Sequence, residues 1–401
     1  MPNPTPEAPA TKPVPTTETG DTLARRGVQP TGRGRRILLI LTSAGVGGAG
    51  RVVQSQVRGL TGEGYRPLAV IPAIDPEAAA ETLAWFEAEG VPAEAHPEVP
   101  AWYSARSPKD LLRFAAFIRR RADIAYLHYG NSYISLKDVV AARLSGRECY
   151  VMVHHAAPLV NARLARMTVW ASRLTHRVIV TTPAMEQLLV GAGVKPSKIE
   201  VIPLAVPAPP ALPDRADART RLGVPHDAFV VASVARLDAG KNVDTVVNAV
   251  AGLSSDGPPA HVVVAGTGET LEHVRSLAAE RLGERGHILG FVPDLADVYA
   301  AADVFALPSN EEGFGLVYVE AAHYGVPAIG SDVGGVRHAI LEGETGLLVP
   351  PADVEALRAA LEQLRRDPER CREMGLRAQR RAQQEFREET MAARHTAVFE
   401  R

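Results

Sequence analysis

The segment DVFALPSNEEGFGLVYVEAAHYGVPAIGSD (303–332) contains the pattern that decides the fold. It begins with a short apolar run, DVFALPS (303–309), and ends with a second one, PAIGSD (327–332). A longer apolar segment lies between them, behind a turn that contains Gly313 and Gly315. Parallel strands need a long crossover connection, which is usually a helix, so the segment predicts a β-α-β unit.

The same alternation of short β-branched runs and longer amphipathic segments extends outward in both directions. The predicted strands of the first half are RILLIL (36–41), RPLAVI (66–71), IAYLHY (124–129), YVMVHH (150–155) and HRVIVTT (176–182). Those that precede 303 in the second half are FVVASVAR (229–236), HVVVAGTG (261–268) and HILGFV (287–292). Strands that are apolar on both faces indicate a parallel sheet covered by helices. We therefore predict an α/β fold of two doubly wound, Rossmann-like domains that face each other across a cleft.

The length of 401 residues agrees with two domains of about 150–200 residues each. The proline-rich stretch VIPLAVPAPPALPDRAD (201–217) cannot continue a helix or an inner strand, so it marks the boundary. A last charged helical segment either completes the second domain or returns to the first. The predicted ranges are 35–205 for the N-terminal domain, 206–220 for the linker, 221–380 for the C-terminal domain and 381–401 for the final helix.

Composition limits the class of protein. Residues 1–34 are rich in Pro, Thr and Gly and are predicted to be disordered, because they bury too little apolar surface to offset their conformational entropy. No stretch reaches the ~20 apolar residues of a spanning helix, and the N-terminus has no apolar signal core. We therefore expect a soluble, cytoplasmic protein. The two cysteines, Cys149 and Cys371, have no metal-like spacing and are predicted to be buried thiols.

The net charge of −2 conceals an asymmetry between the halves. Residues 35–205 carry 20 Lys and Arg against 14 Asp and Glu, whereas residues 206–401 carry 20 against 29. A basic first half suggests an anionic partner, and scattered surface charge is the alternative explanation. Aromatic residues make up only 5% of the chain and do not interleave with a basic stripe, so we expect no nucleic-acid partner.

A glycine-rich loop, TSAGVGGAGRVVQSQ (42–56), follows the first predicted strand and leads into a helix. Its glycines, Gly47 and Gly48 among them, let backbone N–H groups approach an anion at the helix N-terminus. The loop lacks the GxxxxGK[ST] pattern, which argues against an NTPase. A tight strand–helix turn without a ligand is the alternative.

Two basic residues follow the strand FVVASVAR in the sequence RLDAGKN (236–242). Arg236 ends the strand and Lys241 begins a helix, a pair that can hold a diphosphate through a planar fork and a point charge. Gly266 and Gly268 lie at the end of the next strand, where turn geometry is the favoured explanation and a ligand-binding loop is the alternative.

Histidines end two predicted strands: His128 after IAYL, and the pair His154 and His155 after YVMV. A histidine at the carboxyl end of a strand can bind substrate or transfer a proton, although a structural role is more common. The chain has no HExxH, CxxC or DxD pattern, so no metal is implied.

With these motifs, the sequence resembles a known family, the retaining GT-B glycosyltransferases of glycosyltransferase family 4. The likeness is densest over the C-terminal domain and thin over the N-terminal one. It rests on ASVARLDAGKNVDTVVNAV, VVVAGTGE, ADVYAAADVFALPSNEEGFGLVYVEAAHYGVPAIGSDVGG and ETGLLVPPADVEAL, and in the first half on the glycine loop, VMVHH and HRVIVTTPAM…KIEVIPLAV. The resemblance implies a nucleotide-sugar donor (UDP-, GDP- or ADP-linked) on the C-terminal domain, an acceptor on the N-terminal domain, and neither cofactor nor metal.

The resemblance also implies roles for matching residues. Arg236 and Lys241 would contact the donor diphosphate, and Glu320 would bind the ribose hydroxyls. Glu312 would meet the donor sugar, together with a strand-end histidine that aligns best with His154. The remaining donor contacts would come from the backbone of Gly47, Gly48, Phe314, Gly315 and Leu316.

The spacing of the two acids agrees with this assignment. Gly313 and Gly315 allow Glu312 to lie in the turn before the helix, while Glu320 projects from its second turn. One carboxylate then reaches the sugar and the other the ribose, with helix-end amides between them for the phosphates. A carboxylate also suits the positive sugar ring of the transition state.

One departure from the family lies after SDVGG, where an acidic residue is common three positions on. This chain has Arg337 and His338 there. Two other functions remain open at the level of sequence: a sugar phosphorylase or synthase of the same fold, and a non-catalytic nucleotide- or glycan-binding module. The presence of both basic residues and both acids argues against the module.

The segment KDLLRFAAFIRRRAD (109–123) combines apolar residues with Arg119, Arg120 and Arg121. It suits a peripheral contact with the inner membrane face and a lipid-linked acceptor. An ordinary sheet-covering helix with a basic last turn is the favoured alternative.

Overall fold

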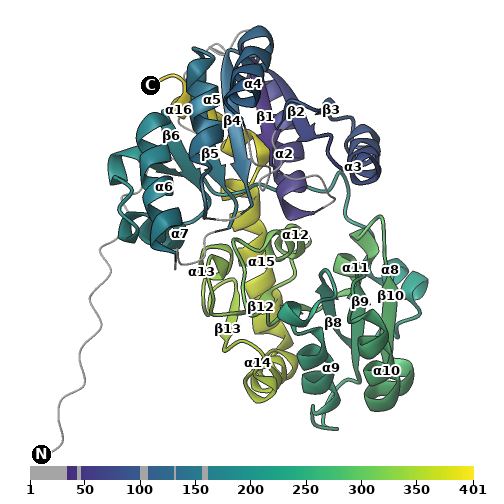
Figure 1. Cartoon of the computed structure of the whole chain (residues 1–401). Helices are drawn as coiled ribbons and strands as arrows, with labels where there is room; N and C mark the ends of the chain where they lie inside the picture. The colour runs from purple at the N-terminus through teal and green to yellow at the C-terminus, as the bar shows by residue number, and fades with distance from the viewer. Residues whose placement is uncertain (1–33, 43–46, 100–106, 131, 156–160) are drawn as a thin grey trace, which may run out of the picture.

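The protein is described by a computed structural model at residues 34–42, 47–99, 107–130, 132–155 and 161–401. Its two parallel sheets, each covered by helices, form two domains (Figure 1). This arrangement confirms the predicted pair of doubly wound α/β domains. The predicted tail, residues 1–34, lies outside the described residues except for Gly34.

The first sheet has seven parallel strands in the order β3-β2-β1-β4-β5-β6-β7. They are β1 (Arg36–Leu41), β2 (Arg66–Pro72), β3 (Ala93–His96), β4 (Ile124–Tyr129), β5 (Glu148–Val153), β6 (Arg177–Val180) and β7 (Ile199–Val201). Its helices are α2 (Gly48–Gly62), α3 (Pro76–Ala88), α4 (Pro108–Arg121), α5 (Leu136–Leu144), α6 (Ala162–Leu174), α7 (Pro183–Gly191) and the 3-10 turn η1 (Pro196–Lys198). Strands β1 and β4 are buried on both faces, as central strands of a covered parallel sheet should be.

The second sheet has six parallel strands in the order β10-β9-β8-β11-β12-β13. They are β8 (Phe229–Val234), β9 (Ala260–Ala265), β10 (Gly286–Gly290), β11 (Val304–Leu307), β12 (Ala328–Ser331) and β13 (Gly346–Val349). Its helices are α8 (Arg215–Leu222), α9 (Val243–Ala251), α10 (Leu271–Leu282), α11 (Ala296–Ala301), α12 (Leu316–His323), α13 (Val336–Ala339), α14 (Val354–Arg366) and α15 (Pro368–Glu385), with the 3-10 turns η2 (Ala239–Lys241) and η3 (Gly283–Arg285). Helix α8 begins within the range assigned to the linker.

The final helical segment is two helices, α15 on the second domain and α16 (Glu388–Phe399) on the first (Figure 1). Helix α16 packs against α2, where a Cβ atom at Gly59 would lie 2.8 Å from the carbonyl oxygen of Glu388. Arg58 of α2 also binds the Glu388 carboxylate at 2.8 Å. The chain crosses between the domains twice, and the crossings meet where the N–H of Val206 donates to the carbonyl of Phe386 at 3.1 Å.

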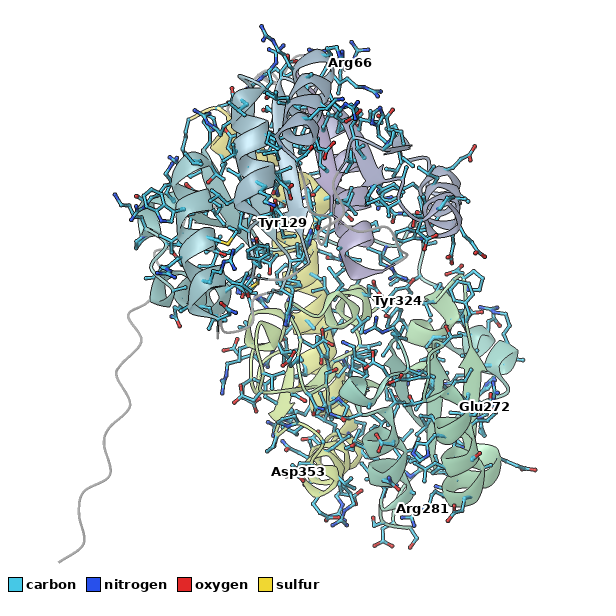
Figure 2. All side chains as sticks on the ribbon, in the orientation of Figure 1. Arg66, Tyr129, Glu272, Arg281, Tyr324 and Asp353 are labelled. Carbon is cyan, nitrogen blue, oxygen red and sulfur yellow. The ribbon has the colours of Figure 1, made fainter. Side chains whose placement is uncertain are left out.

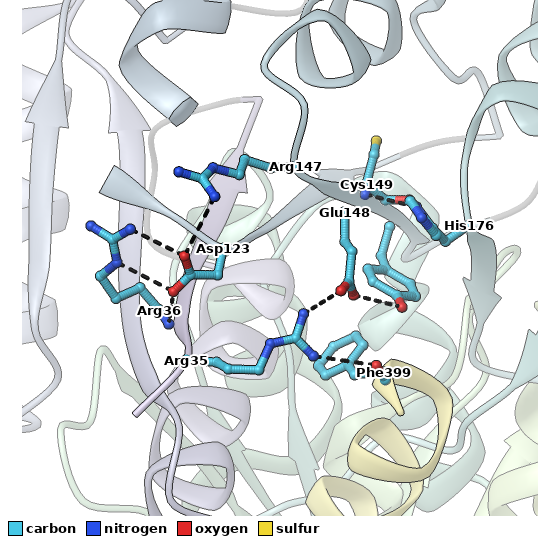
Figure 3. Close-up of polar contacts among 9 residues, drawn as sticks. Arg35, Arg36, Asp123, Arg147, Glu148, Cys149, His176 and Phe399 are labelled. Carbon is cyan, nitrogen blue, oxygen red and sulfur yellow. Dashed lines mark hydrogen bonds and ion pairs between the residues drawn. The ribbon is translucent and has the colours of Figure 1, made fainter. Parts of the chain in front are cut away.

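Several arginines of the basic first half are used in ion pairs at the amino ends of β1, β4 and β5 (Figure 3). Arg36 pairs with Asp123 at 3.1 Å, and Arg35 pairs with Glu148 while also donating to the carbonyl of Phe399. These contacts link the C-terminal end of α16 to the amino ends of the strands, on the side of the sheet away from the second domain. Much of the local positive charge is therefore neutralised within the chain.

The state of the two cysteines and the character of the described helices agree with the predictions from composition. Cys149 and Cys371 are both buried and free, as predicted. Of the helices in the described ranges, none has the length and apolar character needed to cross a lipid bilayer. One hydrophobic cluster runs through both domains, because Phe314 and Val319 of the second domain pack with residues of the first.

Candidate active site

The loops that follow the strands of the two sheets meet at the junction between the domains. Two glycines of the second domain make this approach close. A Cβ atom at Gly313 would lie 2.7 Å from the carbonyl oxygen of His154, and one at Gly335 would lie 2.7 Å from Cγ2 of Thr182. Figure 2 shows Tyr324 on the side of the second domain that faces the first, with Asp353 and Arg281 at the far end. The carboxyl ends of parallel strands are where open α/β sheets bind ligands.

Glu312 lies in the loop after β11, as the sequence predicted. Its Oε1 accepts from Lys241 Nζ at 2.7 Å and from Ser309 Oγ at 3.0 Å. The side chains of Glu312 and Lys241 are 13% and 23% exposed, so the pair is largely shielded but still open to a ligand. All three residues belong to the second domain, and the pair forms without any contribution from the first.

A backbone constraint holds Lys241 in this position. Asn242 follows it in the left-handed region, with φ of 51°, a conformation that asparagine adopts more readily than most residues. Its side-chain amide donates to the carbonyl of Pro308 at 2.7 Å and to Oδ1 of Asn310 at 2.8 Å. The N–H of Asn310 in turn donates to the carbonyl of Gly240 at 2.8 Å. The loop that carries Lys241 is thereby fastened to the loop that carries Glu312.

Arg236, the second predicted diphosphate ligand, is not part of this pair. Its side chain is 78% exposed, and its Nε donates to Asp238 at 2.7 Å. An exposed guanidinium on a flexible stem keeps its reach toward a ligand, because an ion pair in water holds it only weakly. The structure thus brings Lys241 to Glu312 and leaves Arg236 at the rim.

Gly266 and Gly268 have a structural explanation, as the sequence analysis favoured. Their φ values are 142° and 152°, and added Cβ atoms would lie 1.8 Å from the carbonyl oxygen of Ala235 and 2.2 Å from that of Leu237. The loop after β9 can pack against the Arg236 loop only where side chains are absent.

The turn before α12 places Phe314, Gly315 and Leu316 at the helix start. Gly315 is the N-cap, with φ of 83°, and a Cβ atom there would lie 2.4 Å from the Tyr318 ring. The Phe314 side chain is buried, so only its backbone is placed to contact a ligand. Helix α12 begins at Leu316, where the first N–H groups have no partner within the helix.

Glu320 projects from α12 and is held by both domains. Its Oε1 accepts from Arg51 of α2 at 2.6 Å, and its Oε2 accepts from the Tyr299 hydroxyl at 2.7 Å. Burial, together with the adjacent carboxylate, raises the pKa of Tyr299 well above its usual value, so the phenol stays a donor. The Glu320 side chain is 10% exposed.

His154 points into its own domain. Its Nε2 lies 3.0 Å from Nδ1 of His128, and burial lowers the pKa of His154 to about 4, which keeps the ring neutral near pH 7. His155 instead reaches the second domain, where its Nε2 lies 3.7 Å from Glu311. The two neighbouring histidines therefore differ in direction, and both backbones border Gly313.

Gly47 and Gly48 begin α2. Gly47 is its N-cap with extended backbone, and its carbonyl accepts from the N–H of Arg51 at 3.1 Å. A Cβ atom at either glycine would have no described atom within 4 Å, so packing does not explain these glycines. Gly45 lies outside the described residues.

The departure at residues 337–338 has two different local explanations. Arg337 is exposed and pairs with Asp332, which makes it a surface substitution. His338 packs beside the rings of Phe314 and Phe386, which also contact each other; its centroid separations from them are 5.8 Å and 6.2 Å. Burial lowers the pKa of His338 to about 4, so it packs there as a neutral aromatic ring.

The sequence analysis named no role for three residues that contact the predicted site. Ser309 and Tyr299 hydrogen-bond to the two acids, and Arg51 pairs with Glu320. Position gave a signal for Arg51, which directly follows the glycine loop. Tyr299 had none, because its hydroxyl meets Glu320 only through tertiary packing.

A surface hollow of about 500 Å³ lies elsewhere, lined by residues of α3 and the segment that leads into β3, including Leu83 and Ala93. It sits at the amino end of β3, away from the junction. None of the predicted site residues lines it.

Two family models match the chain. The model "Glycosyltransferase Family 4" matches residues 46–208, and "Glycosyl transferases group 1" matches residues 214–381. Together they span most of both domains and meet at the linker.

Curated relatives carry the name D-inositol 3-phosphate glycosyltransferase. The protein of that name from Kineococcus radiotolerans is 40% identical over 232 residues, which are 52% of this chain and 53% of the relative. The one from Geodermatophilus obscurus is 33% identical over 290 residues, 63% of this chain and 64% of the relative. The chain thus spans about half the length of several curated relatives it matches.

Solved structures share the fold. HepE of Anabaena, in a complex with UDP and glucose, superposes with a TM-score of 0.74 at 22% identity, over 91% of this chain and 99% of that one. Sucrose-phosphate synthase of Thermosynechococcus elongatus gives 0.71 at 23% identity, over 92% and 98%.

Proposed function

Because the chain belongs to glycosyltransferase family 4 and has the GT-B fold, we propose that it transfers a sugar from a nucleotide-diphosphate sugar to the hydroxyl of an acceptor. The observation that carries the proposal is the pair of acids on one turn-and-helix segment. Glu312 is held by Lys241, and Glu320 lies eight residues further on, in the second turn of α12, at the same domain junction. This arrangement suits a nucleotide sugar: Glu312 would face the sugar, Lys241 the diphosphate and Glu320 the ribose.

In the proposed complex the second domain holds the donor. Glu320 accepts hydrogen bonds from the ribose hydroxyls, while Lys241 and Arg236 neutralise the diphosphate. Backbone amides at Gly47, Gly48 and residues 314–316 add donors toward the sugar and phosphates. Glu312 faces the donor sugar, where it favours the positive charge that develops on the ring.

The proposed reaction is hexosyl transfer with retention. The bond between the anomeric carbon and the phosphate oxygen breaks, a bond to the acceptor oxygen forms on the same face, and the proton of the acceptor hydroxyl passes to the departing phosphate oxygen. Negative charge develops on the departing diphosphate, and the cations of Lys241 and Arg236 stabilise it without a metal. Proton NMR of the product's anomeric signal tests retention, and activity that persists in EDTA tests metal independence.

The strand-end histidines His154 and His155 are adjacent, but His154 contacts its own domain and His155 contacts the second one. We keep His154 as the first candidate for the donor sugar and His155 as the second. His154 contacts His128 through Nε2, and its buried Nδ1 has no hydrogen-bond partner among the described residues, so Nδ1 is the atom left for a sugar. Comparing His154→Ala with His155→Ala in transfer assays separates the two.

For the acceptor, the names of the relatives suggest a phosphorylated cyclitol, so an inositol phosphate is the first compound to test. Other sugars, lipids and small alcohols remain in the panel, because the matched relatives are covered only in part. The basic first half is compatible with an anionic acceptor.

The test of the function combines binding and turnover. Calorimetric titration with UDP, GDP and ADP should identify one preferred diphosphate, and product mass spectrometry with its nucleotide sugars should give the donor. Binding of none of the three would overturn the proposal. Turnover that requires free phosphate or a sugar 1-phosphate would point to a phosphorylase instead.

A peripheral membrane contact through α4 has weaker support. The apolar side chains of this helix, Phe114, Phe117 and Ile118, are buried against the sheet, so Leu112 is the large apolar side chain it exposes. Arg121 pairs with Glu94 at 2.6 Å. These contacts favour the sheet-covering interpretation, and co-sedimentation with anionic liposomes at low salt tests the alternative.

A further inference from the structure

The contact between Arg51 and Glu320 has a feature that the proposed function does not use. Arg51 belongs to the first domain and Glu320 to the second, and their atoms NH1 and Oε1 lie 2.6 Å apart. The guanidinium therefore approaches the carboxylate from the opposite domain, across the junction where the donor is proposed to bind. The Tyr299 hydroxyl already occupies the other oxygen, at 2.7 Å.

Arg51 and Tyr299 together satisfy both oxygens of the Glu320 carboxylate. Glu320 is only 10% exposed, and a shielded carboxylate without a partner cation would be costly. The bond from Arg51 to Oε1 uses one of the acceptor positions that a ribose diol would otherwise take. A nucleotide that binds through its ribose hydroxyls must therefore share or replace this contact.

Arg51 itself needs an anion. It lies in the first turn of α2, which contains no acidic residue, and the helix dipole disfavours a cation there. Its side chain is 49% exposed and is anchored at a single guanidinium nitrogen, so it can swing without disturbing the core. A guanidinium released from Glu320 would remain at the helix start, beside Gly47 and Gly48.

We propose that Arg51 is a third donor-site cation, which pairs with Glu320 before the donor binds and transfers to the donor diphosphate when the ribose takes its place on Glu320. The inference rests on the proposed function, because it uses Glu320 as the ribose ligand. The exchange keeps both groups satisfied in both states: the carboxylate exchanges a guanidinium for hydroxyl donors, and the guanidinium exchanges a carboxylate for phosphate oxygens. Arginine suits the second partner because its planar fork matches phosphate.

The proposal makes different predictions for ligands with and without phosphates. In Arg51→Gln, a nucleoside such as uridine, guanosine or adenosine should bind more tightly, since its ribose no longer competes with the guanidinium. The matching diphosphate is released from the same competition but loses one charge-assisted hydrogen bond, so relative to the nucleoside it should lose about tenfold in affinity. The ratio of diphosphate to nucleoside affinity should therefore fall, and Arg51→Lys should restore part of it.

Arg58→Gln provides the matched control. Arg58 lies on the same helix but pairs with Glu388 of α16, so this variant should leave the affinity ratio unchanged. Calorimetric titrations of the intact chain, with thermal melts to verify folding, measure all four proteins. An unchanged ratio in Arg51→Gln, or equal tightening of both ligands, would overturn the transfer and leave Arg51 as a closing contact only. Failure of the wild type to bind any diphosphate would overturn the proposed function itself.

Discussion

Glu312 and Glu320 lie on the same short segment, yet they are held in different ways. Glu312 contacts Lys241 and Ser309, both of its own domain. Glu320 contacts Tyr299 of its own domain and Arg51 of the other. The sugar end of the proposed site is thus assembled within one domain, whereas the ribose end depends on how the two domains meet. A variant at Glu312 should therefore affect chemistry, and a variant near Glu320 should affect nucleotide binding and domain approach.

The largest effect is expected from Glu312→Gln, which tests the sugar end of the proposed site, the end assembled within one domain. The amide keeps the shape but cannot stabilise positive charge on the sugar, so kcat should fall by about 10²–10³-fold with nucleotide affinity little changed. Glu311→Gln is the matched control, because Glu311 is adjacent and its side chain is 77% exposed. Equal turnover in Glu312→Gln and wild type would remove the acid from the mechanism.

Gly313→Ala tests the other part of the comparison, the close approach of the two domains. Gly313 is not among the described glycines with positive φ, so the added methyl group strains no backbone but would lie 2.7 Å from the His154 carbonyl oxygen. We expect at least about tenfold lower turnover, because a small displacement of facing groups is costly to catalysis, and little change in melting temperature. Gly315→Ala contrasts with it: positive φ and the Tyr318 ring oppose the methyl within one domain, so stability should fall. Similar melting behaviour of the two variants would contradict this distinction.

The pH dependence of stability tests how α16 is held on the first domain. His395 of α16 is fully buried; its Nδ1 lies 2.8 Å from the Met391 carbonyl, and its Nε2 lies 2.9 Å from the Tyr126 hydroxyl. Burial lowers the pKa of His395 to about 4, against about 6.5 in an unfolded chain. The unfolded state therefore binds more protons between these values, and stability should fall as the pH falls from about 6.5 to 4.

Denaturation at a series of pH values measures this effect. His395→Gln should make the decline shallower, whereas His226→Gln, a change at an exposed histidine, should leave its slope unchanged. An unaltered slope in the His395 variant would show that another group dominates.

Tyr299→Phe should give the smallest effect. It removes one hydrogen bond to Glu320 and leaves the Arg51 pair in place. A single hydrogen bond of this kind corresponds to a change of about threefold to tenfold in diphosphate affinity. Titration with the preferred diphosphate measures it, and kcat at saturating donor should stay close to wild type. A loss confined to kcat would place Tyr299 in the chemistry rather than in ribose binding.

The strands that the sequence analysis missed share a reason. β3 (AEAH), β7 (IEV) and β13 (GLLV) are edge strands of three or four residues, and the first two lack a continuous apolar run. Central strands such as β1 and β8 are buried on both faces and were evident, because double burial leaves a continuous apolar pattern. The C-terminal segment was predicted as one helical stretch but bends after Glu385 into α15 and α16.

By itself, the sequence determined the α/β class, the two doubly wound domains and the position of both acids around the Gly313–Gly315 turn. These features depend on local periodicity, glycine and proline, which act over a few residues. Only the tertiary structure decided that Arg51 pairs with Glu320, that His154 turns toward His128 while His155 faces Glu311, and that Arg236 stays at the rim. The physical reason is that these contacts join residues on different elements, and for Arg51 and His155 on different domains, so their partners follow from packing across the junction and leave no periodic trace along the chain.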